Sequence, residues 1–256
     1  MPVSLALAFA AIAVAFLLSL WAVQRRTHDA ATADVGWTVL VAAGAIVAAL
    51  IADTLPARRA LVALLAAAAS LRLGAYLLRD RVLSGRGEDG RYQALRARWG
   101  AHAQRNFLFL YLAQGVFAFL FLIPIRAAMR DGWLDAWDLA GALLWLVAIA
   151  GESAADRQLA AFRADPANRG GVCRAGLWRY SRHPNYFFEW LQWWAYVLIG
   201  RGAPLTVLGP VMMFLFLWFI TGIPYTERQA LRSRGDRYRE YQRTTSAFFP
   251  WPPRAE

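Results

Sequence analysis

The chain has 256 residues, of which 59% are hydrophobic, and its formal net charge is +11 with arginine as its sole basic residue type. Long apolar runs separated by arginine-rich loops favour a protein that crosses a membrane several times over a soluble protein. Because the arginines are spread over many loops, they do not indicate a nucleic-acid-binding patch. One cysteine excludes an intramolecular disulfide, and with only three scattered histidines beside it we expect no metal site.

Seven apolar segments each approach the roughly 20 residues that a helix needs to cross the hydrocarbon of a membrane. The sixth is short unless the amphipathic stretch before it is counted, and no internal repeat relates the segments. We therefore predict an all-α integral membrane protein with seven transmembrane helices, in a single domain over residues 1–256. The expected spans are Val3 to Val23, Val35 to Asp53, Ala60 to Leu78, Phe107 to Ile125, Trp137 to Ala155, Tyr186 to Ile199 and Pro204 to Ile223.

The arginines alternate between rich and poor loops. The loops after the first, third and fifth spans and the C-terminal tail hold most of them, and the other loops hold few. Because positively charged loops tend to stay in the cytoplasm, we expect the N-terminus outside and the C-terminus in the cytoplasm. The first segment lacks a basic start and is followed by Arg25 and Arg26, which predicts a retained span rather than a cleaved signal.

Three polar side chains share one face of the third span. Arg72, Tyr76 and Arg79 are spaced i, i+4 and i+7. A charge within a span costs at least ~2.5 kcal/mol on insertion scales, so we expect this face to look into the helix bundle or a wet cavity. Alternatively, Arg79 extends to the membrane surface and Tyr76 belongs to an interfacial belt. Asp53, at the end of the second span, either caps its helix or faces Tyr76, where the two groups would hold one proton.

A second polar stripe leaves the fifth span on its cytoplasmic side. Glu152, Asp156 and Arg163 recur at i, i+4 and i+11. They are either ion-pair partners, or Asp156 accepts hydrogen bonds from a ribose or a carboxamide while Arg163 meets a phosphate. The loop that follows supplies Arg169 and Arg174, and since it lacks a Gly-x-Gly-x-x-Gly run after a strand, a Rossmann site is excluded.

The run from Leu177 to Glu189 is polar and basic and leads directly into the sixth span. Pro184 suits the first turn of a helix, so His183, Asn185 and Glu189 crowd a helix N-terminus whose exposed N–H groups favour an anion. A plain juxtamembrane anchor rarely needs His, Asn and Glu together. We interpret the run as half of a nucleotide site.

The C-terminal tail, from Tyr225 to Trp251, is basic and amphipathic. By itself it is typical of a surface helix on anionic lipid. Its Tyr238 and Tyr241 could also fold back over a nucleotide, and both interpretations stay open.

The second half of the chain resembles the steroid 5-alpha-reductase family and its bacterial relatives, and more distantly the sterol C14-reductases, which share an Arg-His-x-Asn-Tyr signature. The matching pieces are Glu152 to Arg163, Gly176 to Trp190, Glu227, Tyr238 to Arg243, and Phe248 to Trp251. The resemblance implies a seven-helix reductase of the bacterial inner membrane. Such an enzyme uses NADPH to saturate the C4–C5 double bond of a 3-oxo-4-ene steroid or a similar lipophilic enone, with that substrate and membrane lipid as its partners.

The resemblance also implies roles for single residues. Tyr76 binds the substrate's carbonyl, where a hydrogen-bond donor stabilises the enolate that hydride addition builds. Asp53 stands one residue out of register with the family's assisting glutamate. Further substrate contacts are implied for Arg72, Arg79 and Arg105. Contacts with NADPH are implied for Asp156, Arg163 and Asn185. We assign further cofactor contacts to Glu152, Arg174, Tyr180, His183, Glu189, Glu227, Tyr238 and Tyr241. Residues 1–130 would mainly form the substrate cavity and residues 137–251 the NADPH site.

Two other functions fit parts of the same pattern. Methyltransferases of the isoprenylcysteine carboxyl methyltransferase type, which depend on S-adenosylmethionine, also carry Arg-His-Pro-x-Tyr followed by a late Glu and a Tyr-x-x-Tyr-like tail. They usually have a glycine soon after the Tyr, where this chain has Phe187 to Glu189, and they lack an obvious counterpart of the stripe from Asp156 to Arg163. A channel or transporter would use the buried charges as a polar pathway, but offers no reason for the cluster that begins at His183.

Overall fold

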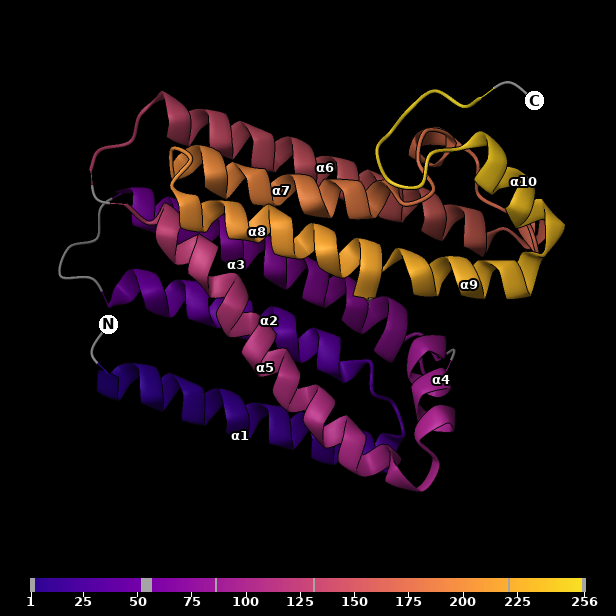
Figure 1. Cartoon of the computed structure of the whole chain (residues 1–256), viewed down its shortest axis with the longest axis horizontal. Helices are drawn as coiled ribbons and strands as arrows, with labels where there is room; N and C mark the ends of the chain where they lie inside the picture. Colours follow the sequence, from indigo (N-terminus) through magenta and orange to yellow (C-terminus); the bar gives the residue numbers. More distant parts are fainter. Residues whose placement is uncertain (1–2, 52–56, 86, 131, 221, 255–256) are drawn as a thin grey trace. The chain divides into compact units, whose positions relative to one another are not determined.

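A computed structural model describes the chain except residues 1–2, 52–56, 86, 131, 221 and 255–256. Over the described residues the protein is helical and contains no strand, as predicted (Figure 1). The chain divides into two compact units, one of Met1–Asp135 with Ala203–Thr206 and one of Ala136–Gly202 with Val207–Glu256. The boundary at Asp135 lies between the two parts that we expected, residues 1–130 for the substrate and residues 137–251 for the cofactor. The roles of the two parts stay predictions.

The first unit is built from α1 (Val3–Thr27), α2 (Thr32–Leu50), α3 (Ala57–Leu77), α4 (Gly90–Trp99) and α5 (Ala103–Ala128). A π-helical turn, η1 (Leu78–Val82), extends α3, and a short 3-10 turn, η2 (Gly100–His102), joins α4 to α5. α2 packs against α1, α3 and α5. It does so closely, because Gly44 lies against Leu122 of α5 and Gly74 of α3 lies against Thr38.

A polar network, absent from the sequence-based predictions, ties the start of α2 to α4. Asp34 accepts hydrogen bonds from Arg81 Nη1 at 3.0 Å and from the Tyr92 hydroxyl at 2.8 Å, and it forms a close ion pair with Arg91. Next to it, Glu88 accepts from the backbone N–H of Ala30 at 3.0 Å. The network holds the connection between α1 and α2 against the connection between α3 and α4.

The second unit contains α6 (Ala136–Ala164), α7 (Pro184–Ile199), α9 (Ile223–Arg234) and α10 (Asp236–Thr244). α8 (Pro204–Leu215) joins this unit from its fourth residue onward and continues into a π-helical turn, η5 (Phe216–Ile220). Two 3-10 turns, η3 (Pro166–Asn168) and η4 (Gly176–Arg179), interrupt the connection between α6 and α7. α6 and α7 form the main helix pair of the unit.

Among the described residues, six helical runs are long and apolar enough to cross a membrane: Ser4–Thr27, Thr32–Leu50, Ala57–Val82, Gly90–Ala128, Ala136–Ala164 and Pro204–Arg234. They indicate a multi-pass membrane protein. The sixth expected span corresponds to α7, which at 16 residues is shorter than these runs. The number of seven spans, the orientation of the termini and the bacterial inner membrane remain predictions.

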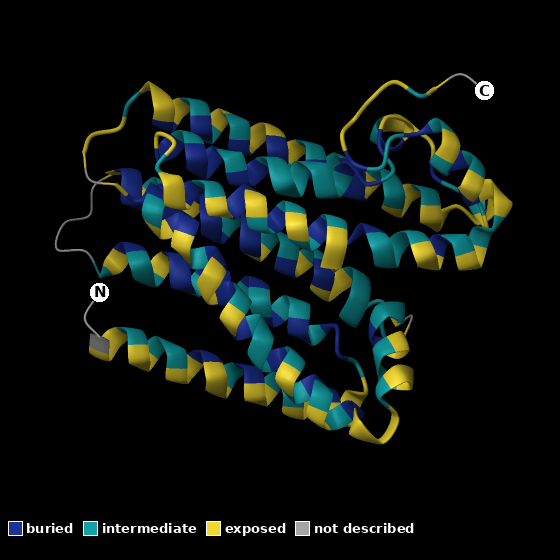
Figure 2. Cartoon of the chain, viewed as in Figure 1, coloured by how far each residue is buried: buried dark blue, intermediate teal, exposed yellow. Residues whose placement is uncertain are grey.

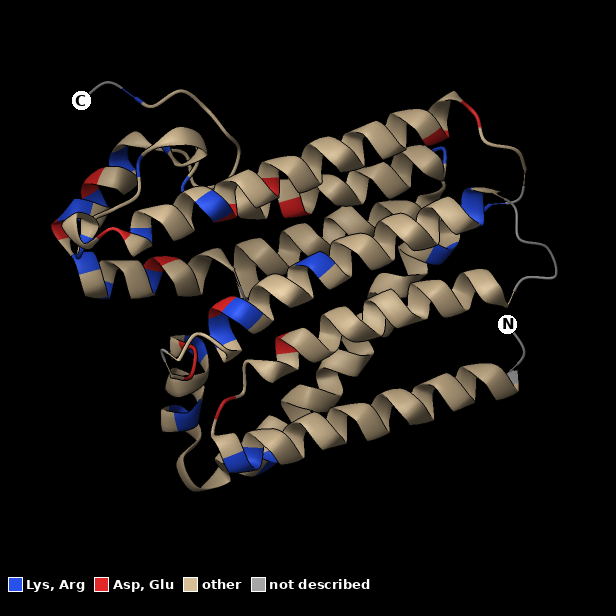
Figure 3. Ribbon diagram, turned by 180° about the vertical axis from the view of Figure 1, so that it is seen from behind, with Lys and Arg blue, Asp and Glu red and all other residues tan. Residues whose placement is uncertain are grey.

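Large apolar side chains on the outer helix faces also fit a lipid environment. Leu7 and Ile12 of α1 are 65% and 67% exposed, and Phe109, Val147 and Phe219 are exposed on α5, α6 and η5. Buried residues follow the helix faces that pack within each unit (Figure 2). Within each unit, many charged residues lie toward helix ends, and a few lie part-way along the helices (Figure 3). Soluble proteins rarely expose so much contiguous apolar surface, which is stable against lipid tails.

The tail differs from the single surface helix that its composition indicates. Gly235 adopts a left-handed conformation with φ of +54°, and this ends α9 and starts α10. Tyr238 and Tyr241 are buried in the second unit rather than exposed to lipid. The amphipathic pattern reflects packing of two short helices against the rest of this unit.

Candidate functional site

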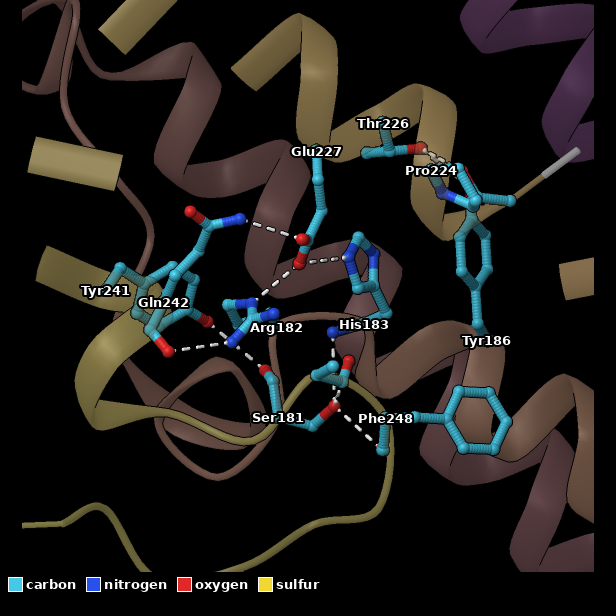
Figure 4. Close-up of polar contacts among 12 residues, drawn as sticks. Ser181, Arg182, His183, Tyr186, Pro224, Thr226, Glu227, Tyr241, Gln242 and Phe248 are labelled. Carbon is cyan, nitrogen blue, oxygen red and sulfur yellow. Dashed lines mark hydrogen bonds and ion pairs between the residues drawn. The ribbon is translucent and has the colours of Figure 1, made fainter. Parts of the chain in front are cut away.

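An ion-paired cluster forms where the basic run before α7 meets α9 and α10 (Figure 4). Arg182 Nε donates to Glu227 Oε1 at 2.6 Å, and His183 Nε2 lies 3.3 Å from the same oxygen. The Tyr238 hydroxyl donates to this oxygen at 3.5 Å, and Gln242 Nε2 donates to Oε2 at 2.8 Å. Glu227 therefore joins three segments that lie far apart in the sequence.

The backbone around Arg182 is clamped to the C-terminal tail. Arg182 Nη1 donates to the carbonyls of Gln242 at 3.1 Å and Thr245 at 2.6 Å, and its backbone N–H donates to Ser246 at 2.8 Å. Ser181 Oγ donates to the carbonyl of Phe248 at 2.9 Å. These bonds satisfy backbone groups of an irregular segment and hold its side chains in fixed positions.

Two aromatic residues, Tyr241 and Phe248, add to these contacts. We call the bonds of Ser181 and Arg182 to the tail, together with these two residues, the clamp. The Tyr241 hydroxyl donates to the carbonyls of Trp178 and, at 3.2 Å, of Ser181. Phe248, which is 1% exposed, packs edge-on against Trp190 of α7 and Phe214 of α8, with ring centroids 5.8 and 5.5 Å away. The tail is thus anchored in the second unit by apolar contacts as well as by hydrogen bonds.

His183 is 2% exposed, and its ring stacks on Tyr186 with centroids 5.3 Å apart. Burial lowers the pKa of His183 because a low-dielectric site disfavours the charged ring, although the hydrogen bond to Glu227 opposes this. Burial also raises the pKa values of the Tyr238 and Tyr241 phenols. At neutral pH the site therefore holds a neutral imidazole and two protonated phenols.

A second polar contact lies between α6 and α7. Asn185 Nδ2 donates to Asp156 Oδ1 at 3.2 Å, and Asp156 is 6% exposed. Glu152 lies one turn before Asp156 on α6 and is 2% exposed, and Glu189 lies one turn after Asn185 on α7. Glu152, Asp156, Asn185 and Glu189 therefore all lie on one helix pair, that of α6 and α7.

Other predicted cofactor residues lie at the edge of this site. Arg163 is exposed at the end of α6, and Arg174 is ion-paired with Glu240 at 2.9 Å. The Tyr180 side chain is 42% exposed, and its carbonyl accepts from the backbone N–H of Trp251 at 2.9 Å. These three residues lie outside the buried centre of the site.

In the first unit, an open cavity of about 460 Å³ lies along α3 and η1 and is lined by Arg72, Ala75, Tyr76, Arg79 and Asp80. Arg72, Tyr76 and Arg79 thus line it together, and their role at a substrate stays a prediction. Arg105 is exposed on α5 and is not among the lining residues. Asp53, and with it the suggested pair with Tyr76, lies outside the described residues.

The sequence-based analysis includes Ser181 and Arg182 in the run from Leu177 to Glu189 but gives neither a role of its own, and it names no role for Gln242, Thr245 or Asp80. Arg182 had a visible signal, because it directly precedes His183 in the Arg-His-Pro run. Gln242 and Thr245 contribute backbone carbonyls to Arg182, for which the sequence carries no residue-type signal.

Comparison with known proteins assigns the chain to a family. A family model described as "Protein of unknown function (DUF1295)" matches residues 20–245. The chain belongs to this family. The match of the DUF1295 family covers α2 to α10 entirely, and so includes the cavity of the first unit and the clamp of the second apart from Ser246 and Phe248.

A further comparison bears on activity. Over 94 residues the DUF1295 protein is 30% identical to methanethiol S-methyltransferase of Mycobacterium tuberculosis, a match that covers 37% of this chain and 36% of that protein. No solved structure matches the chain. The steroid 5-alpha-reductase resemblance is not confirmed by these comparisons, which favour the methyltransferase resemblance instead.

Proposed function

We propose that the protein is a membrane-embedded methyltransferase that uses S-adenosylmethionine. The observation that carries the proposal is the cluster of Arg182, His183, Glu227 and Tyr238. The Arg-His-Pro-x-Tyr run, the late glutamate and the tyrosine-bearing tail are the three pieces that this chain shares with the isoprenylcysteine carboxyl methyltransferase type. In the fold they form one cluster. The likeness to a methanethiol S-methyltransferase supports the same reaction class.

The chemistry of the residues present fits this cofactor. S-adenosylmethionine combines a nucleoside with a sulfonium and an amino acid, so it needs partners for ribose hydroxyls and for positive charge. Asp156 and Asn185 offer a carboxylate and an amide at 3.2 Å from each other, a pair suited to hydroxyl groups. The buried carboxylate of Glu152 and the rings of Tyr186 and Tyr238 suit a cation.

When bound, S-adenosylmethionine supplies an electrophilic methyl carbon, to which a substrate lone pair forms a bond while the carbon–sulfur bond breaks and leaves its electrons on sulfur. We assign to His183 the role of taking the proton that a thiol, hydroxyl or amine loses. Its Nε2 faces Glu227, which Arg182 holds as a carboxylate. Nε2–H therefore donates to Glu227, and Nδ1 remains the basic nitrogen. Glu227 would stabilise the imidazolium that forms.

A second candidate is the NADPH-dependent reduction of a lipophilic enone, and one observation favours it. Tyr76 lines a cavity together with Arg72 and Arg79, where a phenol could donate to a carbonyl oxygen. Such a donor contributes roughly 2.7 to 4 kcal/mol to the stability of a developing oxyanion. In this reading Tyr76→Phe loses enone reduction while cofactor affinity is unchanged.

Binding and turnover by the full chain, purified in detergent, test the proposal. S-adenosylmethionine and S-adenosylhomocysteine are expected to raise the melting temperature more than NADPH does. Radiolabelled methyl groups are expected to reach methanethiol or an extractable membrane component, and Glu227→Gln is expected to abolish transfer. Asp236→Asn is the matched control, since the Asp236 side chain is 93% exposed and pairs with the exposed Arg239. NADPH oxidation with testosterone or progesterone, without methyl transfer, would contradict the proposal and favour the reductase.

A further inference from the structure

The segment that follows α10 turns back toward α7 (Figure 1). In this segment Phe249 packs against Trp190 of α7 and Phe214 of α8, with ring centroids 5.6 and 6.4 Å away. The neighbouring ring of Phe248 reaches Trp218 of η5, with centroids 5.9 Å apart. The segment therefore lies beside the junction of α8 and η5, which belongs to a helical run long and apolar enough to cross a membrane.

The outer surface at this junction is apolar. Leu215 of α8 and Phe219 and Ile220 of η5 are exposed. The tail adds two exposed aromatic side chains close by, because Phe249 is 49% exposed and Trp251 is 70% exposed. Contact with lipid stabilises such a surface, whereas contact with water makes it costly.

Polar and basic groups lie next to these two rings. The backbone N–H of Trp251 donates to the carbonyl of Tyr180 at 2.9 Å, in the polar run before α7. Tyr180 is itself exposed, and so are Arg179 and Arg254. Aromatic rings that carry a polar group collect where hydrocarbon meets headgroups, and arginine binds phosphate. The surface thus changes from apolar to basic within a few residues, as the edge of a membrane does.

We propose that Phe249 and Trp251 insert into the interfacial layer of the membrane, with Arg179 and Arg254 at the phosphate groups of the lipids. A bilayer fits this surface better than a second protein chain does, for two reasons. The rings lie beside a run that crosses the membrane, and a negatively charged lipid surface complements the flanking arginines. The inference goes beyond the proposed function and does not depend on which reaction the site performs.

The inserted segment is also part of the clamp. The carbonyl of Thr245 accepts from Arg182 at 2.6 Å, and the carbonyl of Phe248 accepts from Ser181 at 2.9 Å. Both carbonyls precede Trp251 by only a few residues, so contact between its ring and lipid limits their motion. The membrane thereby helps to hold the clamp in place.

Spin labels test the depth of the two rings. Cys173→Ser removes the sole cysteine, and Phe249→Cys or Trp251→Cys then carries a nitroxide while the other ring is kept. The full chain is placed in vesicles of phosphatidylcholine and phosphatidylglycerol. Oxygen concentrates in hydrocarbon and a nickel chelate stays in water, so the ratio of their collision rates with the label reports depth. We expect this ratio to be several-fold higher at both positions than in the control Asp236→Cys, whose native side chain is 93% exposed.

Two outcomes of the labelling would overturn the inference. Ratios at Phe249→Cys and Trp251→Cys equal to that at Asp236→Cys would show that the rings face water. Poor access of both reagents would show that protein covers the rings, and magnetic coupling between labels would identify that protein as a second copy of the chain. Neither measurement uses a cofactor, so a failure of methyl transfer would leave this inference standing.

The link to the clamp has its own readout. Trp251→Ser removes little packing within the protein, because the side chain is mostly exposed. In the same vesicles it is expected to raise the rate of deuterium uptake several-fold in peptides that contain Arg182 or Trp251, whose backbone N–H groups bond within the clamp region. Trp251→Tyr keeps an interfacial ring and should exchange as the wild type does. Unchanged uptake in Trp251→Ser, or equal uptake in both variants, would contradict a role of the membrane in holding the clamp.

Discussion

Arg182 and Glu227 form an ion pair of 2.6 Å across 45 residues of sequence, and it links the start of α7 to α9. Their side chains are 10% and 15% exposed, so both charged groups have lost most of their hydration. Each charge offsets the desolvation of the other. The backbone carbonyls that Arg182 also binds, those of Gln242 and Thr245, make the pair a junction of three segments.

Removal of Glu227 should therefore destabilise the protein. Glu227→Ala leaves the guanidinium of Arg182 largely buried without its carboxylate, which costs roughly 3 to 5 kcal/mol for a buried pair. We expect a lower melting temperature in detergent and loss of ligand-induced stabilisation. Asp236→Asn, which breaks an exposed ion pair, should leave the melting temperature unchanged. Equal melting temperatures for Glu227→Ala and wild type would contradict the role of this pair.

His183 should make stability depend on pH. Its folded-state pKa lies below the ordinary value of 6.5 because burial disfavours the imidazolium. Below pH 6.5 the unfolded chain takes up a proton that the folded chain does not, so stability is lost as the pH falls. The loss is at most about 1.4 kcal/mol per pH unit. Melting temperatures between pH 8 and pH 5 should fall less steeply for His183→Gln than for the wild type, and parallel curves would refute this assignment.

Asn185 should contribute to cofactor affinity for either candidate reaction. Its amide donates to Asp156 at 3.2 Å and so orients a carboxylate suited to ribose hydroxyls. We expect Asn185→Ala to raise the dissociation constant of the bound nucleotide about 2- to 10-fold, the effect of one neutral hydrogen bond. Isothermal titration in detergent measures this change. Asn106→Ala, in α5 of the other unit, is the control and should bind as the wild type does.

Asp34 should stabilise the first unit. It lies between Arg81 and Arg91 and also accepts from Tyr92, and its side chain is 16% exposed. Asp34→Ala leaves two guanidinium groups that repel each other, so we expect a loss of roughly 3 to 5 kcal/mol. Limited proteolysis should then cut the connection between α1 and α2 faster. Glu240→Gln, which affects a half-exposed ion pair, should not change the cleavage rate. Unchanged cleavage in Asp34→Ala would show that the network is dispensable.

Much of the helical framework could be predicted because hydrophobicity along a span is a local property. The expected spans Val3 to Val23 and Trp137 to Ala155 lie within α1 and α6. Two features were not predicted. α4, which carries Tyr92 in its first turn, is polar and short, and its place depends on Asp34 in a distant segment. The break at Gly235 depends on a backbone conformation that composition alone does not specify.

The sequence by itself determined which chemical groups are available: a membrane-embedded chain with Arg, His, Asn and Glu beside its sixth apolar segment, and Arg72 and Tyr76 on one face of its third. Periodicity and residue type suffice for this, because they act over a few residues. Only the tertiary structure decided which groups meet. Glu227 lies 44 residues after His183, and Asn185 lies 29 residues after Asp156, so their contacts depend on how α6, α7 and α9 pack. Packing is a property of helix faces in three dimensions, and no local pattern in the chain encodes the pairing.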